Sequence, residues 1–367
     1  MKACVKSPPI TWPAVNDVPV QSNDCDLSMS AWLLPLIVFG AFFLTGRLRR
    51  YALARSLMDV PNARSSHVSP TPRGGGVAIV LCFLGVLPLL VALGALDVAG
   101  AWAMTGAGGL VALIGFFDDH GHIAARWRLL AHFGAAVWAL VWLQPAGVMP
   151  AGVPGGASGV SMVLAALYLV WMLNLYNFMD GIDGMASVEA ICVCGGGALL
   201  YWLQGASADA LVPLSLAGAV LGFLVWNFPP AKIFMGDAGS GFLGITLGVL
   251  SFQAAAVSPD LFWSWTILLG VFIVDATYTL IRRLLRGDRV YEAHRSHAYQ
   301  HASRRAGRHL PVTLAVAGIN LLWLLPLALG VARGVLSPWI GLLAAYLPLI
   351  VVAARLRAGV PEDGSVV

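Results

Sequence analysis

The sequence predicts an all-α, polytopic integral membrane protein, and three observations support this fold class. Hydrophobic residues make up 59% of the 367-residue chain, and the mean hydropathy is +0.80. Charged residues make up only 11%, against about 25% in a typical soluble domain. The apolar residues come in long runs rather than in alternation, which favours membrane helices over a β-barrel.

Apolar runs of about 17–25 residues are typical of membrane-spanning helices, and this criterion places eleven spans, several of them short or adjoining. In order along the chain we expect spans at 31–46, 74–96, 100–117, 128–144, 159–178, 186–203, 210–228, 240–257, 261–281, 312–332 and 335–354.

The Lys and Arg residues lie almost entirely on one side of these spans. The other side holds only Lys2, Lys6 and Arg333. Basic loops stay in the cytoplasm, so we expect a periplasmic N-terminus and a cytoplasmic C-terminus. The odd number of spans agrees with this orientation.

Residues 1–28 form a polar leader to which we assign no role. They lack the basic-then-apolar order of a cleavable signal peptide, and Met29 is an alternative start. Residues 29–367 are expected to form a single membrane-embedded domain. The net charge of +4 is modest and gives no indication of a nucleic-acid partner.

Five polar segments all fall on the side expected to be cytoplasmic. The first, HVSPTPRGGG (His67 to Gly76), places Arg73 beside three glycines. This arrangement can offer a cation and backbone N–H groups to a phosphate. The alternative, which we favour for this segment taken alone, is a basic loop whose glycines open a tightly packed helix.

The second segment, FFDD, ends with the adjacent carboxylates Asp118 and Asp119. They repel each other at the end of a span unless a cation lies nearby. The alternative is an exposed loop start, where two aspartates cost little. Arg126 and Arg128 follow in the same short loop. A bound metal or phosphate would explain why acidic and basic side chains occur together there.

The third segment is NLYNFMDGIDG, which closes an apolar run. Asn174, Asn177, Asp180 and Asp183 recur at a spacing that lets neighbouring members share one face of a helix. Oxygen-bearing side chains grouped in this way suit a hard cation such as Mg²⁺. A helix-terminating turn explains the Asp and Gly residues, but it does not explain the two asparagines inside the span.

The fourth segment, FMGDAGS, runs from Phe234 to Ser240. Asp237 is flanked by small residues, which let a ligand approach closely. Ser240 is alternatively a simple N-cap of the following span, and that alternative leaves Asp237 unexplained.

The fifth segment, EAHRSHAYQH, has histidines at 294, 297 and 301, a spacing that predicts one helical face. Zinc is one interpretation, but a cationic cluster for a diphosphate fits Arg295 better. The alternative is a solvated basic loop. Asp275, within the ninth expected span, is either functional or an internal ion-pair partner.

These residues together predict a Mg²⁺-dependent phosphotransferase. Oxygen ligands suit Mg²⁺, and phosphoryl transfer needs in-line positioning and charge neutralisation more than covalent help. A site at the bilayer surface suits one soluble substrate and one lipid substrate.

The five motifs, in this order over roughly 31–356, resemble the polyprenyl-phosphate N-acetylhexosamine-1-phosphate transferases of glycosyltransferase family 4. The resemblance implies transfer of a sugar phosphate from a UDP-N-acetylhexosamine to undecaprenyl phosphate, with release of UMP and with Mg²⁺ (Mn²⁺ as a substitute ion). It also implies a bacterial inner membrane location and a cytoplasmic active site, and it leaves a homodimer open.

The resemblance also implies roles for individual residues. Asp118 and Asp119 resemble the pair that acts on the lipid phosphate, and Asp237 resembles the principal Mg²⁺ ligand, with Asn177 as a second. The remaining implied roles are on the substrate and diphosphate side: Asp180 and Asp183 for the nucleotide, Phe234 for packing near uracil, Arg73 for the basic position of the first loop, and His294 and His297, with Arg295 and His301 beside them, for the diphosphate.

Two departures favour the O-antigen-initiating members, whose sugars include GlcNAc and 6-deoxy sugars such as FucNAc or QuiNAc. The first loop reads PTPRGGG rather than a lysine-rich sequence, and the histidines are spaced rather than consecutive. The alternatives are a phospho-MurNAc-pentapeptide transferase and, from another class, a membrane transporter. His120, His122 and His132 map to no role.

The lipid phosphate needs no strong general base, because a phosphate monoester with a second pKa of about 6 is largely dianionic at neutral pH. We therefore expect direct attack, with Asp118 orienting the acceptor, rather than a covalent aspartyl intermediate.

Overall fold

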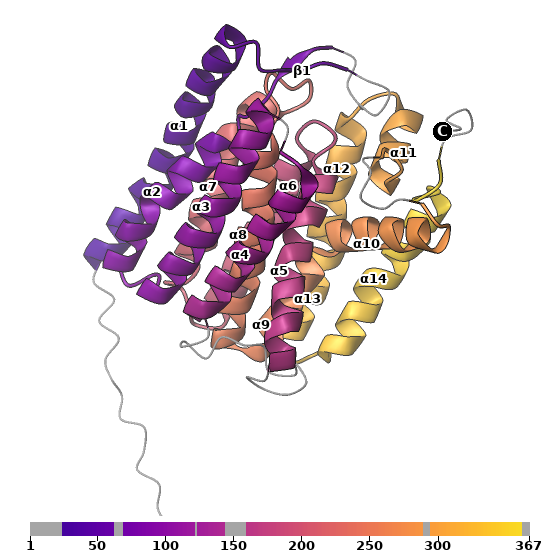
Figure 1. Ribbon diagram of the computed structural model, residues 1–367. Coiled ribbons are helices and arrows are strands. Elements are labelled where there is room, and N and C mark those ends of the chain that lie inside the picture. The colour runs from indigo at the N-terminus through magenta and orange to yellow at the C-terminus, as the bar shows by residue number, and fades with distance from the viewer. Residues whose placement is uncertain (1–23, 62–68, 122, 144–158, 289–293, 362–367) are drawn as a thin grey trace, which may run out of the picture.

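The computed structural model describes residues 24–61, 69–121, 123–143, 159–288 and 294–361, and these residues form a bundle of helices (Figure 1). The helices are α1 (Asp24–Ala54), α2 (Val77–Ala92), α3 (Val98–His120), α4 (Ala125–Leu143), α5 (Gly159–Met179), α6 (Met185–Leu203), α7 (Leu211–Asn227), α8 (Asp237–Val257), α9 (Pro259–Leu268), α10 (Gly270–Leu285), α11 (Ala298–Ala306), α12 (Leu310–Ile319), η2 (Asn320–Leu324, a π-helix), α13 (Leu325–Ala332) and α14 (Pro338–Arg355).

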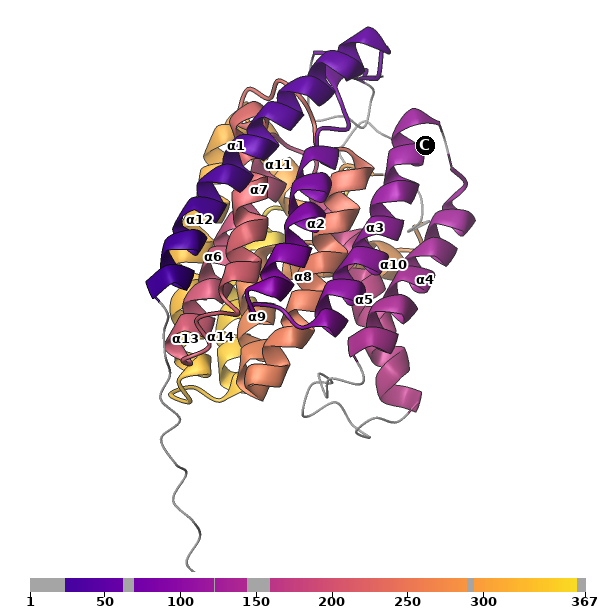
Figure 2. The same ribbon diagram turned by 90° about the vertical axis from the view of Figure 1, so that its left-hand side faces the viewer.

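Helix α8 forms the centre of the bundle and contacts α2, α3, α4, α5, α6 and α9 (Figure 2). Its glycines allow this close packing. A Cβ at Gly244 would lie 2.6 Å from the carbonyl oxygen of Met172 on α5. Small residues let membrane helices approach backbone to backbone, and they fix the first turn of α8 against its neighbours.

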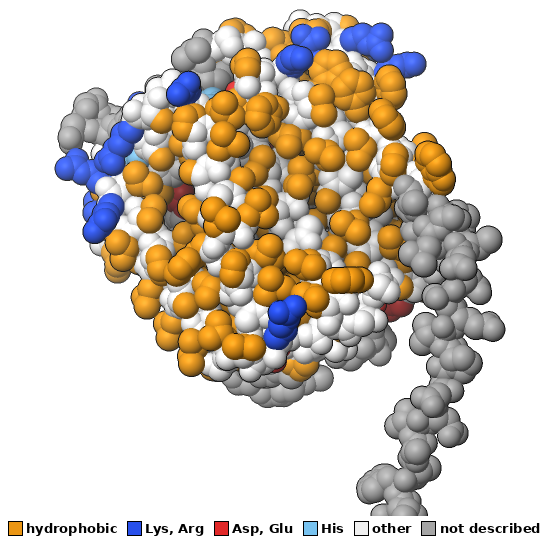
Figure 3. Space-filling view, turned by 180° about the vertical axis from the view of Figure 1, so that it is seen from behind, with side chains coloured by type: hydrophobic (Ala, Val, Ile, Leu, Met, Phe, Trp, Pro, Cys, Tyr) orange, Lys and Arg blue, Asp and Glu red, His pale blue; other side chains and the backbone are white. Residues whose placement is uncertain are grey.

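The outer surface is apolar, as a membrane protein requires. Hydrophobic side chains cover most of one face of the molecule, and most Lys and Arg lie toward the top and one side (Figure 3). Among the described residues seven helices are long and apolar enough to cross a membrane, or eight if α9 and α10 form one broken span. Helices α2 and α7 are shorter and also apolar. The all-α, polytopic class is confirmed, whereas the count of eleven and the orientation stay predictions.

The ninth expected span is not a single straight helix. Helices α9 and α10 meet at a bend of 69°, and α10 lies across the bundle (Figure 1). The bend falls at Leu269 and Gly270, where a Cβ on Gly270 would lie 3.2–3.4 Å from side chains of Leu324, Tyr346 and Leu349. Gly270 therefore lies close to side chains of η2 and α14 at the bend.

A short antiparallel hairpin joins α1 to α2. Strands β1 (Met58–Asp59) and β2 (Thr71–Pro72) pair Met58 with Pro72 and Asp59 with Thr71. The hairpin delivers the glycine-rich segment to the same end of the bundle as the end of α3 and the start of α8.

Candidate active site

The last turn of α3 meets the first turn of α8 through Asp119. One carboxylate oxygen of Asp119 accepts a hydrogen bond from the backbone N–H of Asp237 (3.3 Å), and the other accepts from that of Ala238 (3.5 Å). The preceding Gly236 has φ +78°, and a Cβ there would lie 2.5 Å from Asp119 Oδ2. Asp119 therefore caps α8 and fixes Asp237, a role that the sequence analysis did not anticipate.

Asp118 points the other way, toward Asp237 and Arg128. Arg128 Nη1 lies 2.5 Å from Asp118 Oδ2 and 3.3 Å from Asp237 Oδ2. The second oxygen of Asp118 accepts from the backbone N–H of Ile123 at 2.7 Å. One guanidinium from α4 thus contacts two carboxylates, one from α3 and one from α8.

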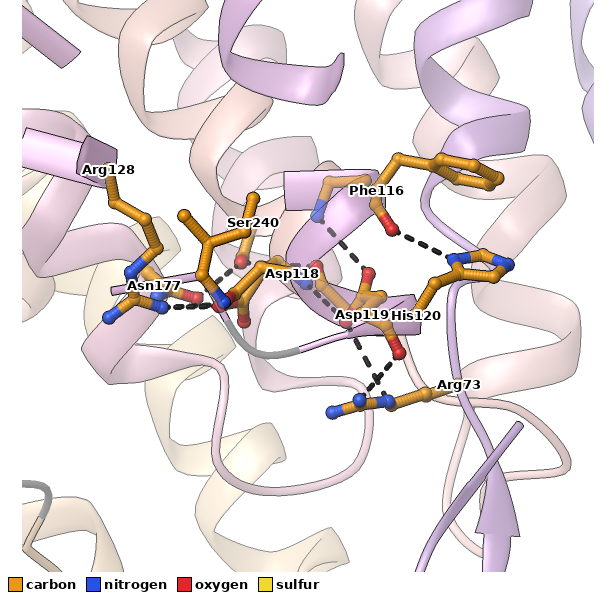
Figure 4. A network of polar contacts seen from close by, with 12 residues as sticks. Arg73, Phe116, Asp118, Asp119, His120, Arg128, Asn177 and Ser240 are labelled. Carbon is orange, nitrogen blue, oxygen red and sulfur yellow. Dashed lines mark hydrogen bonds and ion pairs between the residues drawn. The ribbon is translucent and has the colours of Figure 1, made fainter. Parts of the chain in front are cut away.

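A second guanidinium, that of Arg73, contacts Asp119, the other aspartate of the pair. Arg73 donates to the backbone oxygen of Asp119 at 2.5 Å, and its Nε lies 3.9 Å from Asp119 Oδ1. Figure 4 shows Arg73 and Arg128 on opposite sides of the two aspartates. The basic residue expected in the first loop therefore belongs to this network.

The glycines beside Arg73 serve packing. The N–H groups of Gly75 and Gly76 donate to the carbonyl oxygens of Phe234 (2.9 Å) and Met235 (2.8 Å). A Cβ on Gly76 would lie 2.5 Å from the Cα of Gly239. The hypothesis that these two N–H groups bind a phosphate is wrong, because the FMGDAGS segment already accepts from both.

Asn177 joins α5 to this network, since its Oδ1 accepts from the Ser240 hydroxyl at 2.7 Å. Ser240 lies within the first turn of α8, whose N-cap is Gly236, so the alternative of Ser240 as N-cap is wrong. Asn174 donates from Nδ2 to Val170 O at 2.7 Å within its own helix.

The four polar residues of NLYNFMDGIDG do not share one helix. Helix α5 ends at Met179, so Asp180 and Asp183 lie in the turn that follows it. Burial, with the carboxylates of Asp237, Asp119 and Asp183 nearby, raises the pKa of Asp180 well above its usual range.

The histidine loop also departs from the predicted helical face. Helix α11 begins at Ala298, and His297 is its N-cap, in a capping box with Gln300. His294 precedes the helix, so the three histidines do not share one helical face. This start is fixed from α10, because Asp275 accepts from the N–H groups of Ala298 (2.9 Å) and Tyr299 (3.0 Å).

Within this loop, His294 and His297 lie in one environment, and Arg295 and His301 lie in another. The rings of His294 and His297 stack with centroids 4.8 Å apart. Burial, with His297 and Arg283 nearby, lowers the pKa of His294 to about 3. His294 is therefore neutral near pH 7. His301 and the backbone oxygen of Arg295 instead contact Arg304, at 3.3 and 3.1 Å.

A cavity of about 470 Å³ collects residues from α3, α4, α5, α8 and the histidine loop. Its lining includes four residues to which the sequence assigned a metal or diphosphate role: Asn177, Asp237, His294 and His297. Arg128 lines it as well. Carboxylate, amide, imidazole and guanidinium groups thus converge on one space at the end of the bundle.

A second cavity, of about 410 Å³, holds Asp183 and Phe234. Asp183 Oδ2 accepts from the N–H of Ala231 at 3.0 Å, and its Oδ1 lies 3.1 Å from His309 Nδ1. Arg308 and His309 also line this cavity. Neither was predicted, and the only local signal was a basic pair directly after Gly307.

The donor set near Asp237 fits a small hard cation. Asp237, Asp118 and Asn177 offer oxygen ligands, which Mg²⁺ prefers, and Mg²⁺ takes few protein ligands because it keeps waters and substrate phosphates. Arg128 already places positive charge between the two carboxylates. Among the described residues no group of three or more His, Cys, Asp or Glu side chains is suited to a metal.

A buried residue outside the five segments holds the two loops together. Asn227 accepts from the N–H of Gly184 at 3.0 Å and donates to the carbonyl oxygen of Ile233 at 3.0 Å. It links the turn after α5 to the segment before α8. Its position at the end of an apolar run was the only sequence signal.

Comparison with known proteins shows the family to which the chain belongs. A family model described as Glycosyl transferase family 4 matches residues 101–255. A decaprenyl-phosphate N-acetylglucosaminephosphotransferase of Mycolicibacterium smegmatis is 33% identical over 72% of this chain and 74% of its own length. A probable undecaprenyl-phosphate N-acetylglucosaminyl 1-phosphate transferase of Bacillus subtilis is 30% identical over 70% and 72%. A phospho-N-acetylmuramoyl-pentapeptide-transferase of Geobacillus kaustophilus is 29% identical over 70% and 82%.

Proposed function

Because this chain belongs to glycosyl transferase family 4, we propose that it transfers an N-acetylhexosamine-1-phosphate from a UDP-sugar to undecaprenyl phosphate and releases UMP. One observation carries the proposal. Asp237, Asn177 and Arg128 line one cavity at the end of a membrane-helix bundle, and Asp118 pairs with Arg128 beside it, where a soluble donor and a lipid acceptor can both reach them.

The two cavities suggest separate places for the two ends of the donor. Phe234 and Asp183 line the second cavity, which offers a ring and a carboxylate to a nucleobase. The histidines and Arg128 line the first cavity and offer donors to phosphate oxygens.

Mg²⁺ is the cofactor that we propose, with Asp237 and Asn177 as its protein ligands and Asp118 close by. When bound, the ion neutralises charge on the diphosphate. Arg128 supplies fixed positive charge beside it, and Asp119 holds the Asp237 backbone in place. Mn²⁺ offers the same oxygen preference.

Direct attack by the lipid phosphate is the mechanism that we propose. Both oxygens of Asp118 are engaged, one by Arg128 and the other by the Ile123 N–H. A carboxylate held in this way is a poor nucleophile but a good orienting group. A phospho-enzyme trapped after incubation with UDP-sugar alone would exclude direct attack.

The remaining choices concern the sugar and the pathway. We propose GlcNAc or a 6-deoxy-HexNAc such as FucNAc or QuiNAc, in the first step of lipid-linked O-antigen synthesis, at the cytoplasmic face of a bacterial inner membrane. The first loop and the spaced histidines argue against the pentapeptide sugar, although pentapeptide transferases are among the relatives.

A panel assay tests the proposal. The purified protein is incubated with undecaprenyl phosphate, Mg²⁺ and, in turn, UDP-GlcNAc, a UDP-6-deoxy-HexNAc and UDP-MurNAc-pentapeptide, and UMP is measured. We expect UMP from one of the first two donors. UMP from the pentapeptide donor alone would assign the protein to peptidoglycan synthesis. No UMP from any donor would favour a transporter.

A further inference from the structure

The first cavity has an inner end that the proposed chemistry does not use. His132 lines it from α4, and Asn174 lines it from α5. His132 is four residues after Arg128, and Asn174 is three residues before Asn177. Since α4 begins and α5 ends at the active-site end of the bundle, each lies about one helical turn, roughly 5 Å, further into the membrane.

The His132 side chain has a hydrogen-bonding group that no described protein group uses. Its Nδ1 is buried and has no hydrogen-bond partner in the described part of the chain. The neighbouring polar residues are engaged: Arg128 with two carboxylates, and Asn177 with Ser240. Buried polar groups are nearly always satisfied by protein, water or ligand, so a cavity-lining histidine with an unpartnered ring nitrogen is a candidate contact for a ligand or water.

The walls around His132 are apolar. Val111, Ile114, Leu129 and Leu173 line the same cavity. Leu129 on α4 and Phe178 on α5, next to Arg128 and Asn177, are also 47% and 39% exposed, whereas Val111 and Leu173 are buried. Exposed apolar side chains therefore border the cavity at the level of Arg128, which suits a phosphate that carries a hydrocarbon chain.

We propose that His132 binds the phosphate monoester of the polyprenyl acceptor, with Asn174 beside it, where the phosphate meets its first isoprene unit. This assignment rests on the proposed function. Arg128 and Asp118, one turn closer to the end of the bundle, face the same phosphate from the side of the donor. The proposed function places the nucleotide in the second cavity, so His132 should act on the acceptor alone.

Kinetics with each substrate varied in turn tests the assignment. His132→Ala removes the donor, His132→Gln keeps an amide donor, and His120→Gln is the matched control, because His120 lies outside the cavity and contacts Phe116 O and Tyr51. We expect His132→Ala to raise KM for undecaprenyl phosphate about 10- to 100-fold, as for a lost hydrogen bond to a charged group. KM for the UDP-sugar should stay within about twofold, with partial recovery in His132→Gln. A rise in KM for the donor instead, or no change in either, would overturn the assignment.

A binding measurement keeps the inference falsifiable without turnover. Farnesyl phosphate should raise the thermal unfolding midpoint of the wild type and of His120→Gln, but not that of His132→Ala. Farnesol tests whether the isoprenoid chain alone binds, and inorganic phosphate tests whether the phosphate alone binds. Equal stabilisation of the wild type and His132→Ala by farnesyl phosphate would refute the contact, whereas a wild type that binds it but forms no UMP would refute only the proposed function.

Discussion

Asp275 gives the clearest test of how the fold positions the histidine loop. It lies on α10 and accepts hydrogen bonds from the N–H groups of Ala298 and Tyr299, and from the Thr279 hydroxyl at 3.1 Å. His297 Nδ1 lies 3.4 Å away. The carboxylate thus caps α11 and holds the histidine that lines the cavity.

The expected size of the effect follows from these contacts. A hydrogen bond to a charged group contributes about 1.5–3 kcal/mol. Asp275→Asn keeps one acceptor oxygen and loses one such bond, so the ordered loop should lose about 1.5–3 kcal/mol. This corresponds to roughly a 10- to 150-fold fall in kcat/KM if the reaction needs the ordered loop. Asp275→Ala loses both bonds and should fall further.

Two assays check this prediction together. UMP release gives kcat/KM, and hydrogen exchange reports the order of the N–H groups at Ala298 and Tyr299. The matched control is Asp209→Asn, an exposed carboxylate that lines a different cavity, beside Tyr201. If Asp275→Asn kept wild-type kcat/KM and wild-type exchange at both amides, the capping role would be refuted.

Three further predictions concern the rest of the site. Asp237→Asn should abolish UMP release while the protein remains folded in the membrane, and near-normal activity would remove Asp237 from the metal site. Gly76→Ala, at the N-cap of α2, should destabilise the protein by about 1–3 kcal/mol through overpacking against Gly239. Gly85→Ala within α2 meets no atom of another element within 4 Å and should not destabilise the protein; equal unfolding midpoints would contradict this. Because the pKa of Asp180 is raised in the fold, its contribution to stability is greatest below about pH 4 and is lost as the pH rises toward the raised pKa. The thermal unfolding midpoint of the wild type should therefore fall as the pH rises. Asp180→Asn should remove this slope, and saturating Mg²⁺ should reduce it. Identical slopes in the wild type and Asp180→Asn would contradict the pKa shift.

The sequence was sufficient for the fold class and the family. Long apolar runs predict membrane helices whatever their packing, and the membership of glycosyl transferase family 4 is confirmed. The break between α9 and α10 was not predictable, because Leu269 and Gly270 lie inside an uninterrupted apolar run. At the bend Gly270 lies close to residues of η2 and α14 that are distant in the sequence, and hydropathy does not report such contacts.

The same limit applies to the active site. The motifs identify Asp118 and Asp237, but the partner of both is Arg128, 10 and 109 residues away. The start of α11 depends on Asp275, more than 20 residues earlier, and for that reason a local helical spacing predicted the wrong arrangement of histidines. Residues whose role depends on a long-range partner, such as Asn227 and His309, carry little local signal.

The most direct test of the central claim is UMP release by the purified protein with a UDP-HexNAc donor, undecaprenyl phosphate and Mg²⁺, followed by mass spectrometry of the lipid. The account predicts UMP and an undecaprenyl-diphospho-sugar in equal amounts, and neither product after chelation of the metal or without the lipid. UMP release that continues with EDTA present, or that needs no lipid acceptor, would contradict it.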